Sequence, residues 1–165
     1  MAQYEIYRIS TNERINLIEA DAAFAQALAQ AHPEAPDVGA RRTDLDARNR
    51  EYRDAVNHVR SRLIEAGTVV TVTGYGPIAL QGREEDQRTL QGLAFGAQLR
   101  LGQGDTTTLT PFLDRENIQH MLTPMQLLET WQRGAGFVSY IYAKSWAIKE
   151  MNPETTDPSN PALWQ

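Results

Sequence analysis

The sequence predicts an α+β protein in which a long C-terminal helix packs with two shorter helices and small antiparallel β-hairpins, preceded by an N-terminal β-hairpin and a short helix. Apolar residues recur at helical spacing from Leu127 to Ile148, the longest such run in the chain. Two shorter runs of helical period, over 45–63 and 90–101, precede it. Paired β-rich stretches separated by turn residues lie between these runs and are typical of hairpins.

The N-terminal hairpin is predicted from two β-rich stretches, 4–10 and 15–19, on either side of a short polar turn. The alanine-rich stretch 20–31 follows and predicts a short helix, because alanine has the highest helix propensity. Its larger apolar residues, Phe24 and Leu28, are four positions apart and share one face. We therefore expect this face to be the apolar one.

Two proline-containing stretches suggest how the chain divides. Residues 32–39 contain two prolines and a glycine and predict a linker. We therefore expect an N-terminal hairpin–helix module over 1–38 and an α+β domain over 39–152. The proline-rich residues 153–165 predict an extended C-terminal arm.

Within the central domain, Thr43 is the predicted N-cap of a helix that ends at Gly67. Arginines and acidic residues interleave along this helix, which indicates a solvated face with ion pairs rather than an anion site. A hairpin over 68–80 follows, and then a helix over 84–101 with acidic residues in its first turn. A third hairpin is expected over 106–122.

The long C-terminal helix is predicted from Thr123, a good N-cap, to the residue before Pro153. Pro124 fits the first helical position, where no N–H donor is needed. Such a helix would be about 43 Å long. Gly134 and Gly136 each cost about 1 kcal/mol relative to alanine inside a helix. We therefore expect another element to pass close to the backbone there.

Residue types that carry chemistry are present but are not arranged for it. His32, His58 and His120 fall in a linker, a charged helix and a strand, without the spacing of metal ligands. The acidic run 84–86 begins a helix, where acidic residues already have an electrostatic reason to occur. We therefore expect no enzyme activity, no cofactor and no metal site.

Composition also excludes several classes of partner. The net charge of −5 gives no reason to expect binding to nucleic acid or to an anionic membrane surface. With no cysteine, the chain contains no disulfide and no thiol chemistry. No apolar run approaches the roughly 20 residues that span a bilayer, so a soluble protein is expected.

A charged helix over 48–67 is followed by a short hairpin, a helix with a polar start, an acidic-Asn turn at Asp114 and Asn117, and a terminal helix ending in a Lys-containing stretch at Lys149. This order over 48–151 resembles a small domain of unknown function found in tailed-phage tail-fibre and tail-accessory proteins. The first hairpin is also similar to the opening of small phage tail-accessory proteins. The usual tryptophan before the acidic-Asn turn is replaced here by phenylalanine. The positions that match the two patterns are Arg53, Asn57, Arg60, Gly67, Phe112, Asp114, Asn117, Leu122, Trp146 and Lys149, and Asn16, Ile18, Glu19, Ala20, Asp21 and Phe24.

This resemblance implies a structural or adaptor protein of the phage virion, at the tail tip, baseplate or fibre attachment, that joins or positions other tail proteins. The alternative is a tail-fibre assembly chaperone that acts in the host cytoplasm and is absent from the mature particle. An enzyme acting on cell-surface glycans is a third hypothesis. A homo-oligomer is expected, with a trimer favoured by analogy with three-fold tail fibres.

Large aromatic and apolar residues in the last third of the chain predict an interface. The long helix carries more apolar surface than the other elements can cover. The C-terminal arm ends in two large apolar residues, and we expect it to pack on a neighbouring subunit or partner chain. The candidate interface residues are Trp131, Tyr140, Tyr142, Trp146, Leu163 and Trp164.

Overall fold

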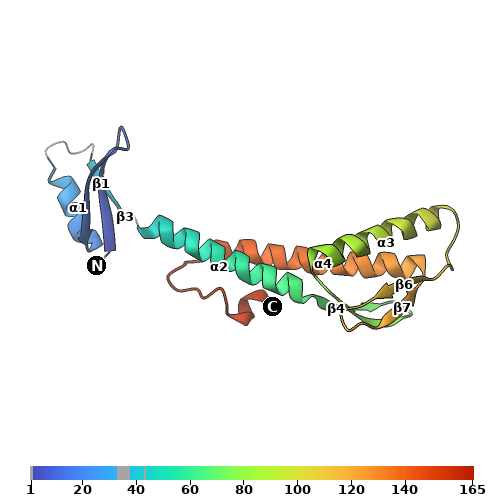
Figure 1. Cartoon of the computed structure of the whole chain (residues 1–165). Coiled ribbons are helices and arrows are strands. Elements are labelled where there is room, and N and C mark those ends of the chain that lie inside the picture. The colour runs from blue at the N-terminus through green and yellow to red at the C-terminus, as the bar shows by residue number, and fades with distance from the viewer. Residues whose placement is uncertain (1, 33–37, 43) are drawn as a thin grey trace. The chain divides into compact units, whose positions relative to one another are not determined.

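The computed structural model describes residues 2–32, 38–42 and 44–165. The chain forms two compact units, Met1–Asp54 and Ala55–Gln165 (Figure 1). Helices and small antiparallel sheets make up both units, so the predicted α+β class is confirmed. Most of the predicted linker, at residues 33–37, and the predicted N-cap Thr43 lie outside the described residues.

The described residues of the first unit form a three-stranded antiparallel sheet, one complete helix and the beginning of a second helix. The expected hairpin and helix form, but a third strand pairs with the first, giving the strand order β2-β1-β3. The boundary expected between residues 38 and 39 therefore falls inside a strand. The elements are β1 (Ala2–Arg8), β2 (Arg14–Ala20), α1 (Ala22–Gln30) and β3 (Val38–Arg42).

The face that α1 buries is not the one expected. Ala25 and Ala29 are fully buried, whereas Phe24 and Leu28 are exposed, Phe24 by 59% of its surface. Ala29 belongs to a small apolar cluster with Ile6 of the sheet. The alanine methyl groups let the helix lie close to the strands, which a row of larger side chains would prevent.

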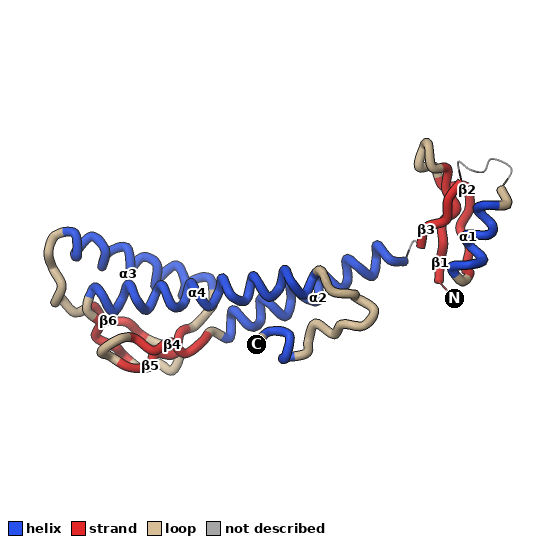
Figure 2. The backbone as a smooth tube through the Cα atoms, turned by 180° about the vertical axis from the view of Figure 1, so that it is seen from behind, coloured by secondary structure: helices blue, strands red, loops and turns tan. Residues whose placement is uncertain are grey.

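The second unit begins within α2 (Asp44–Ala66), which crosses the division between the two units. The helices α3 and α4 lie side by side, and two hairpins lie against one side of this helix pair (Figure 2). All elements of this unit except the last, η1, were expected. They are β4 (Thr68–Val72), β5 (Gly76–Leu80), α3 (Glu84–Gly102), β6 (Thr110–Leu113), β7 (Gln119–Leu122), α4 (Pro124–Lys149) and the short 3-10 helix η1 (Pro161–Trp164).

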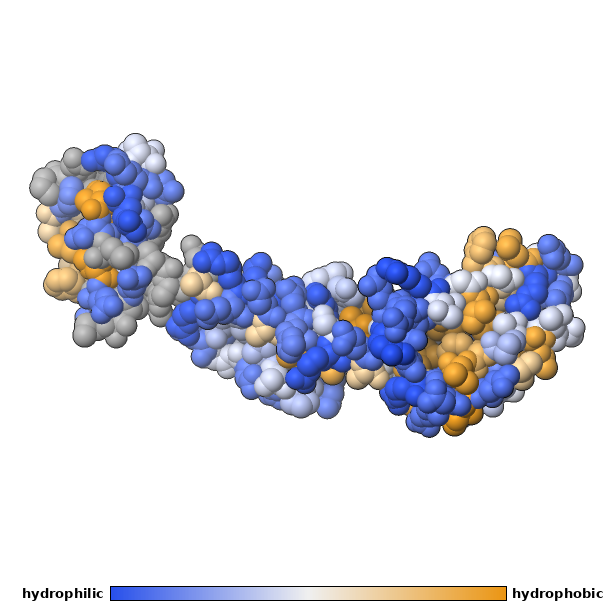
Figure 3. Space-filling view, viewed as in Figure 1, coloured by the Kyte–Doolittle hydropathy of each residue, from blue (hydrophilic) through white to orange (hydrophobic). Residues whose placement is uncertain are grey.

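The core of the second unit lies between the hairpins and the helix pair. It joins buried side chains of both hairpins to residues of α3 and α4, and Trp131 packs on its edge. On the face drawn in Figure 3, apolar residues gather over α3 and the hairpins, while α2 is mostly hydrophilic. Within the described residues no helix is both long and apolar enough to cross a membrane. The buried core residues are Val70, Val72, Ile78, Leu80, Leu90, Ala97, Leu122 and Leu127.

The helix α4 begins where the sequence predicts and ends slightly earlier. A capping box fixes its start, because the side chains of Thr123 and Gln126 each accept a hydrogen bond from the other's backbone N–H. The two glycines differ in their surroundings. A Cβ atom at Gly134 would lie 3.0 Å from Leu80 Cδ1, as a close approach requires, whereas Gly136 has nothing within 4 Å.

Two other glycines allow the end of α2 to touch the end of β5. A Cβ atom at Gly82 would lie 1.6 Å from the Ile64 carbonyl oxygen, and one at Gly67 would lie 1.9 Å from the Leu80 carbonyl oxygen. Gly67 also has a φ of +72°, which side chains disfavour. Only glycine fits at these two positions, so the two segments are locked together.

The variant Gly82→Ala should lower the free energy of unfolding by about 2 kcal/mol or more, because two backbone segments must move apart. Its control is Gly92→Ala, at an exposed position inside α3 where an added Cβ meets nothing within 4 Å. That control should raise stability by about 0.5–1 kcal/mol. Urea unfolding of the two variants measures both values, and equal effects would contradict the close approach.

Candidate functional site

The aromatic residues predicted as one interface lie on two different sides of α4. Tyr140 and Tyr142 are two positions apart, which is about 200° around a helix. Their exposed fractions are 45% and 38%, and that of Trp146 is 61%. Trp131 is half-buried against the core. The structure therefore pairs Tyr142 with Trp146 and separates both from Tyr140.

The exposed pair on the first side of α4 meets an arginine from α2. The rings of Tyr142 and Trp146 have centroids 6.2 Å apart. The guanidinium carbon of Arg60 lies 4.7 Å from the centre of the Tyr142 ring. Arg60 Nη1 donates a hydrogen bond to Asn57 Oδ1 at 3.0 Å. We call Asn57, Arg60, Tyr142 and Trp146 the Arg60 cluster.

Arg60 has no carboxylate partner among the described residues, whereas Arg83, Arg88 and Arg133 each form an ion pair. Its Nε atom is buried and makes no hydrogen bond within the described part of the chain. A buried donor without an acceptor costs about 1–3 kcal/mol. The cation–π contact of the guanidinium with the Tyr142 ring contributes about 0.5–1 kcal/mol at an exposed site. Asn57 and Tyr142 thus hold the guanidinium of Arg60 in place, while its Nε–H has no hydrogen-bond acceptor among the described residues.

The other side of α4 is covered by the chain's own C-terminus. The Lys144 ammonium lies 5.3 Å from the centre of the Tyr140 ring and donates to the Gln165 carbonyl oxygen. Trp164 is only 6% exposed, and its indole N–H donates to the Pro158 carbonyl oxygen at 2.9 Å. Leu163 is half-buried.

The C-terminal residues therefore differ from the expected extended arm. They fold back and end in η1, whose N-cap Asn160 accepts a hydrogen bond from Ala162 N–H. Trp164 finds its buried position within its own chain rather than on a neighbour. A sequence pattern of prolines with a terminal tryptophan does not distinguish these two outcomes, because both bury the same side chain.

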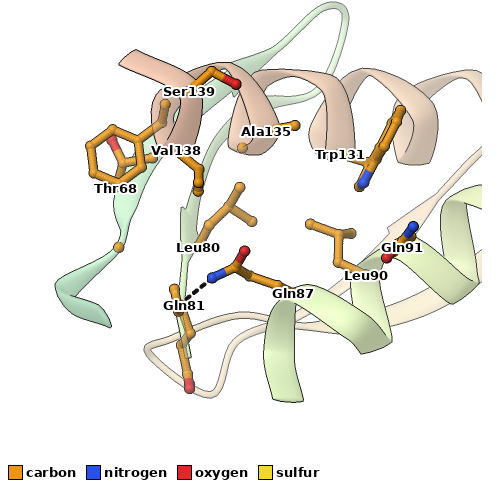
Figure 4. Close-up of a pocket in the computed structure, with 14 residues that line it drawn as sticks. Thr68, Leu80, Gln81, Gln87, Leu90, Gln91, Trp131, Ala135, Val138 and Ser139 are labelled. Atoms are coloured by element: carbon orange, nitrogen blue, oxygen red, sulfur yellow. Dashed lines mark hydrogen bonds between the residues drawn. The ribbon is translucent and has the colours of Figure 1, made fainter. Parts of the chain in front are cut away.

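A cavity of about 240 Å³ lies over the middle of α4. Trp131, Ala135 and Val138 approach it from α4, and Leu80 and Leu90 approach it from the opposite wall (Figure 4). Thr68, Gln81, Gln91 and Ser139 line it with polar groups, and Gln87 Nε2 donates to the Gly82 carbonyl oxygen at 2.6 Å. No lining residue is charged, so the cavity suits an uncharged group.

A polar cluster that was not predicted joins Tyr75, His120 and Asp114. Asp114 Oδ2 lies 3.0 Å from His120 Nε2, and the Tyr75 hydroxyl lies 3.0 Å from His120 Nδ1. An ionised carboxylate can only accept, so His120 Nε2 carries the hydrogen and donates to Asp114, while Nδ1 shares a hydrogen bond with the Tyr75 hydroxyl. The contacts span 45 residues of sequence, which periodicity cannot reveal.

The carboxyl group of Asp114 is the ionised member of this cluster. Burial by itself would raise the pKa of its carboxyl, but hydrogen bonds from His120 and from the N–H groups of Ile118 and Glu116 outweigh burial. The pKa of Asp114 is therefore lower than its ordinary value. Since the N–H groups of Glu116 and Ile118 both donate to Oδ1, the carboxylate also fixes the turn between β6 and β7, in which Asn117 has a φ of +59°.

These groups connect the two hairpins of the second unit. Tyr75 belongs to the turn between β4 and β5, while Asp114 and His120 belong to the β6–β7 hairpin. Each polar atom of the His120 ring already has a partner. In the described part of the chain, no group of three or more His, Cys, Asp or Glu residues could hold a metal ion. The Arg60 cluster is the candidate functional site.

The variant Asp114→Asn should lower the free energy of unfolding at pH 7 by about 1.5–3 kcal/mol, because hydrogen bonds to a charged acceptor are lost. A lowered folded-state pKa contributes stability above the unfolded-state value of 3.8, and this contribution is lost as the pH falls through the folded-state pKa. The gap between wild type and variant should therefore shrink in acid. Urea titrations at several pH values test this, with the exposed Glu116→Gln as control, and a gap that persists in acid would contradict it.

Comparison with known proteins gives one family. The family model described as "Domain of unknown function (DUF4376)" matches residues 46–160, well over half of the chain. No curated protein and no solved structure matches the chain. The expectation of a small domain of unknown function is thus confirmed, while the description of the family names no phage. The chain belongs to the DUF4376 family of domains of unknown function.

Proposed function

We propose that this chain is a non-catalytic adaptor of a tailed-phage virion, at the tail tip, baseplate or fibre attachment, and that it joins or positions other tail proteins. The observation that carries the proposal is the Arg60 cluster, in which Trp146 is 61% exposed beside Tyr142 and an unpaired Arg60. Tryptophan, tyrosine and arginine are the residues most enriched among the energetic centres of protein interfaces.

The surroundings of the cluster favour docking over turnover. Tyr142 and Trp146 stand on a long helix that is capped at its start and packed along one face by buried residues such as Ile141 and Ser145. A rigid aromatic platform loses little conformational entropy when a partner binds. No nucleophile with a general base accompanies the cluster among the described residues.

The placement in a phage particle rests on the resemblance of the second half of the chain to tail-fibre and tail-accessory proteins. Other tail or fibre proteins are the proposed partners, and neither nucleic acid nor a membrane is required. The proposed location is the virion tail, after assembly in the host cytoplasm. Self-association is part of the proposal, with three-fold symmetry favoured by analogy.

Mass spectrometry of purified virions from the phage that encodes this chain should detect it at a fixed copy number. The double variant Tyr142→Ala and Trp146→Ala should reduce its incorporation at least tenfold, because truncating interface anchors costs roughly 2 kcal/mol or more each. The matched control is Phe95→Ala, which removes an equally exposed aromatic ring from α3.

Virions that lack the chain although infected cells contain it would contradict the structural proposal and favour the assembly chaperone. Equal loss of incorporation in the Phe95→Ala control would show that general surface hydrophobicity, rather than the Arg60 cluster, mediates assembly. Circular dichroism of each purified variant confirms that the fold is retained.

A further inference from the structure

The uncharged cavity and the Arg60 cluster follow one another along the same side of α4. Val138 lines the cavity, and Tyr142 of the cluster lies four positions later, one turn along the helix. Ala135 and Trp146 extend the same side in the two directions. From Ala135 to Trp146 the helix rises about 16 Å. A single bound segment can therefore contact both places.

We call the side of α4 from Ala135 to Trp146 the strip. The cavity at one end of this strip selects an uncharged group. Its apolar walls come from Leu80, Leu90, Trp131 and Val138, and its volume of about 240 Å³ has room for a large side chain. Gln91 lies at the cavity, and its side chain makes no hydrogen bond to the described residues, so its amide is available to the backbone of a bound segment. An apolar side chain on a peptide satisfies both features.

The other end selects a negative charge. Arg60 is half-buried and has no ion-pair partner among the described residues, its guanidinium carbon lies over the Tyr142 ring, and Nη1 is oriented by Asn57. A planar guanidinium presents paired N–H groups that match the two oxygens of a carboxylate. Because Nε is buried, a carboxylate from outside the chain would pair with Nη2, which makes no hydrogen bond and is not among the buried unpaired atoms of the described residues. Because no acidic side chain of the described residues pairs with Arg60, this position stays open to a partner.

We propose that the strip from the cavity to the Arg60 cluster binds a segment of a different protein that carries a large apolar side chain and, one to two helical turns away, an aspartate or glutamate. The apolar side chain enters the cavity, and the carboxylate pairs with Arg60 beside Trp146. This inference rests on the proposed adaptor function and names the chemistry that the adaptor recognises. The complementary charge distinguishes it from a purely apolar contact.

A library of random peptides displayed on beads and selected on the immobilised full chain tests the proposal. Enriched peptides should share an acidic residue three to seven positions from a large apolar one. The affinity of a synthesised peptide should fall at least tenfold with Arg60→Ala and with Ala135→Leu, which fills the cavity. Arg62→Ala, at an exposed arginine of the same helix, should leave the affinity unchanged.

The same peptide with glutamine or asparagine in place of its acidic residue should also bind at least tenfold more weakly, a comparison that leaves the protein unaltered. Peptides that require Trp146 but neither the carboxylate nor Arg60 would overturn this inference and leave the adaptor function intact. If no enriched peptide requires Trp146, both this inference and the proposed adaptor function are overturned. If sedimentation velocity shows self-association that Arg60→Ala abolishes, the occupant is a second copy, and the proposal of a different protein is overturned.

Discussion

The close contact between the end of α2 and the end of β5 is the constraint on which the second unit depends. Gly82 and Gly67 each lie so close to the other segment that an added Cβ atom would overlap one of its carbonyl oxygens. Arg115 reinforces the contact, since its N–H donates to the Ala79 carbonyl oxygen and its guanidinium to that of Ala66, both at 2.8 Å. The turn between β6 and β7 thus closes over the same junction, which joins α2 to both hairpins.

The position of the candidate site follows from this junction. Because α2 is held at its C-terminal end, Arg60, two turns earlier, meets Tyr142 of α4. The same contact leaves the cavity between the residues that follow α2, the start of α3 and the middle of α4. Gly134 lets Leu80 approach α4 at the cavity wall. The apolar cavity and the unpaired cation are therefore two consequences of one backbone contact.

Local sequence signals predicted most of the helices and strands, whereas features that depend on long-range contacts were not predicted. Caps and prolines placed α4 within three residues of its end, because a cap acts on its own helix. The strand β3 was missed because its short sequence has little β propensity and its partner residues in β1 lie 30 to 38 positions away. The contact of Tyr75 with His120 and the back-folded Trp164 likewise depend on tertiary structure. The separation of Tyr140 from Tyr142, in contrast, follows from helix geometry alone and could have been predicted.

An NMR spectrum of the arginine Nε–H groups tests the central claim most directly, namely that the α2–β5 contact holds Arg60 on the face of Tyr142. A buried Nε–H without an acceptor should exchange slowly with water, and the protons beside it should be shifted by the aromatic ring. Both features should disappear in Gly82→Ala, while the Asp114–His120 hydrogen bond remains. An Arg60 signal in the wild-type chain with the shift and exchange rate of an exposed arginine would contradict the account.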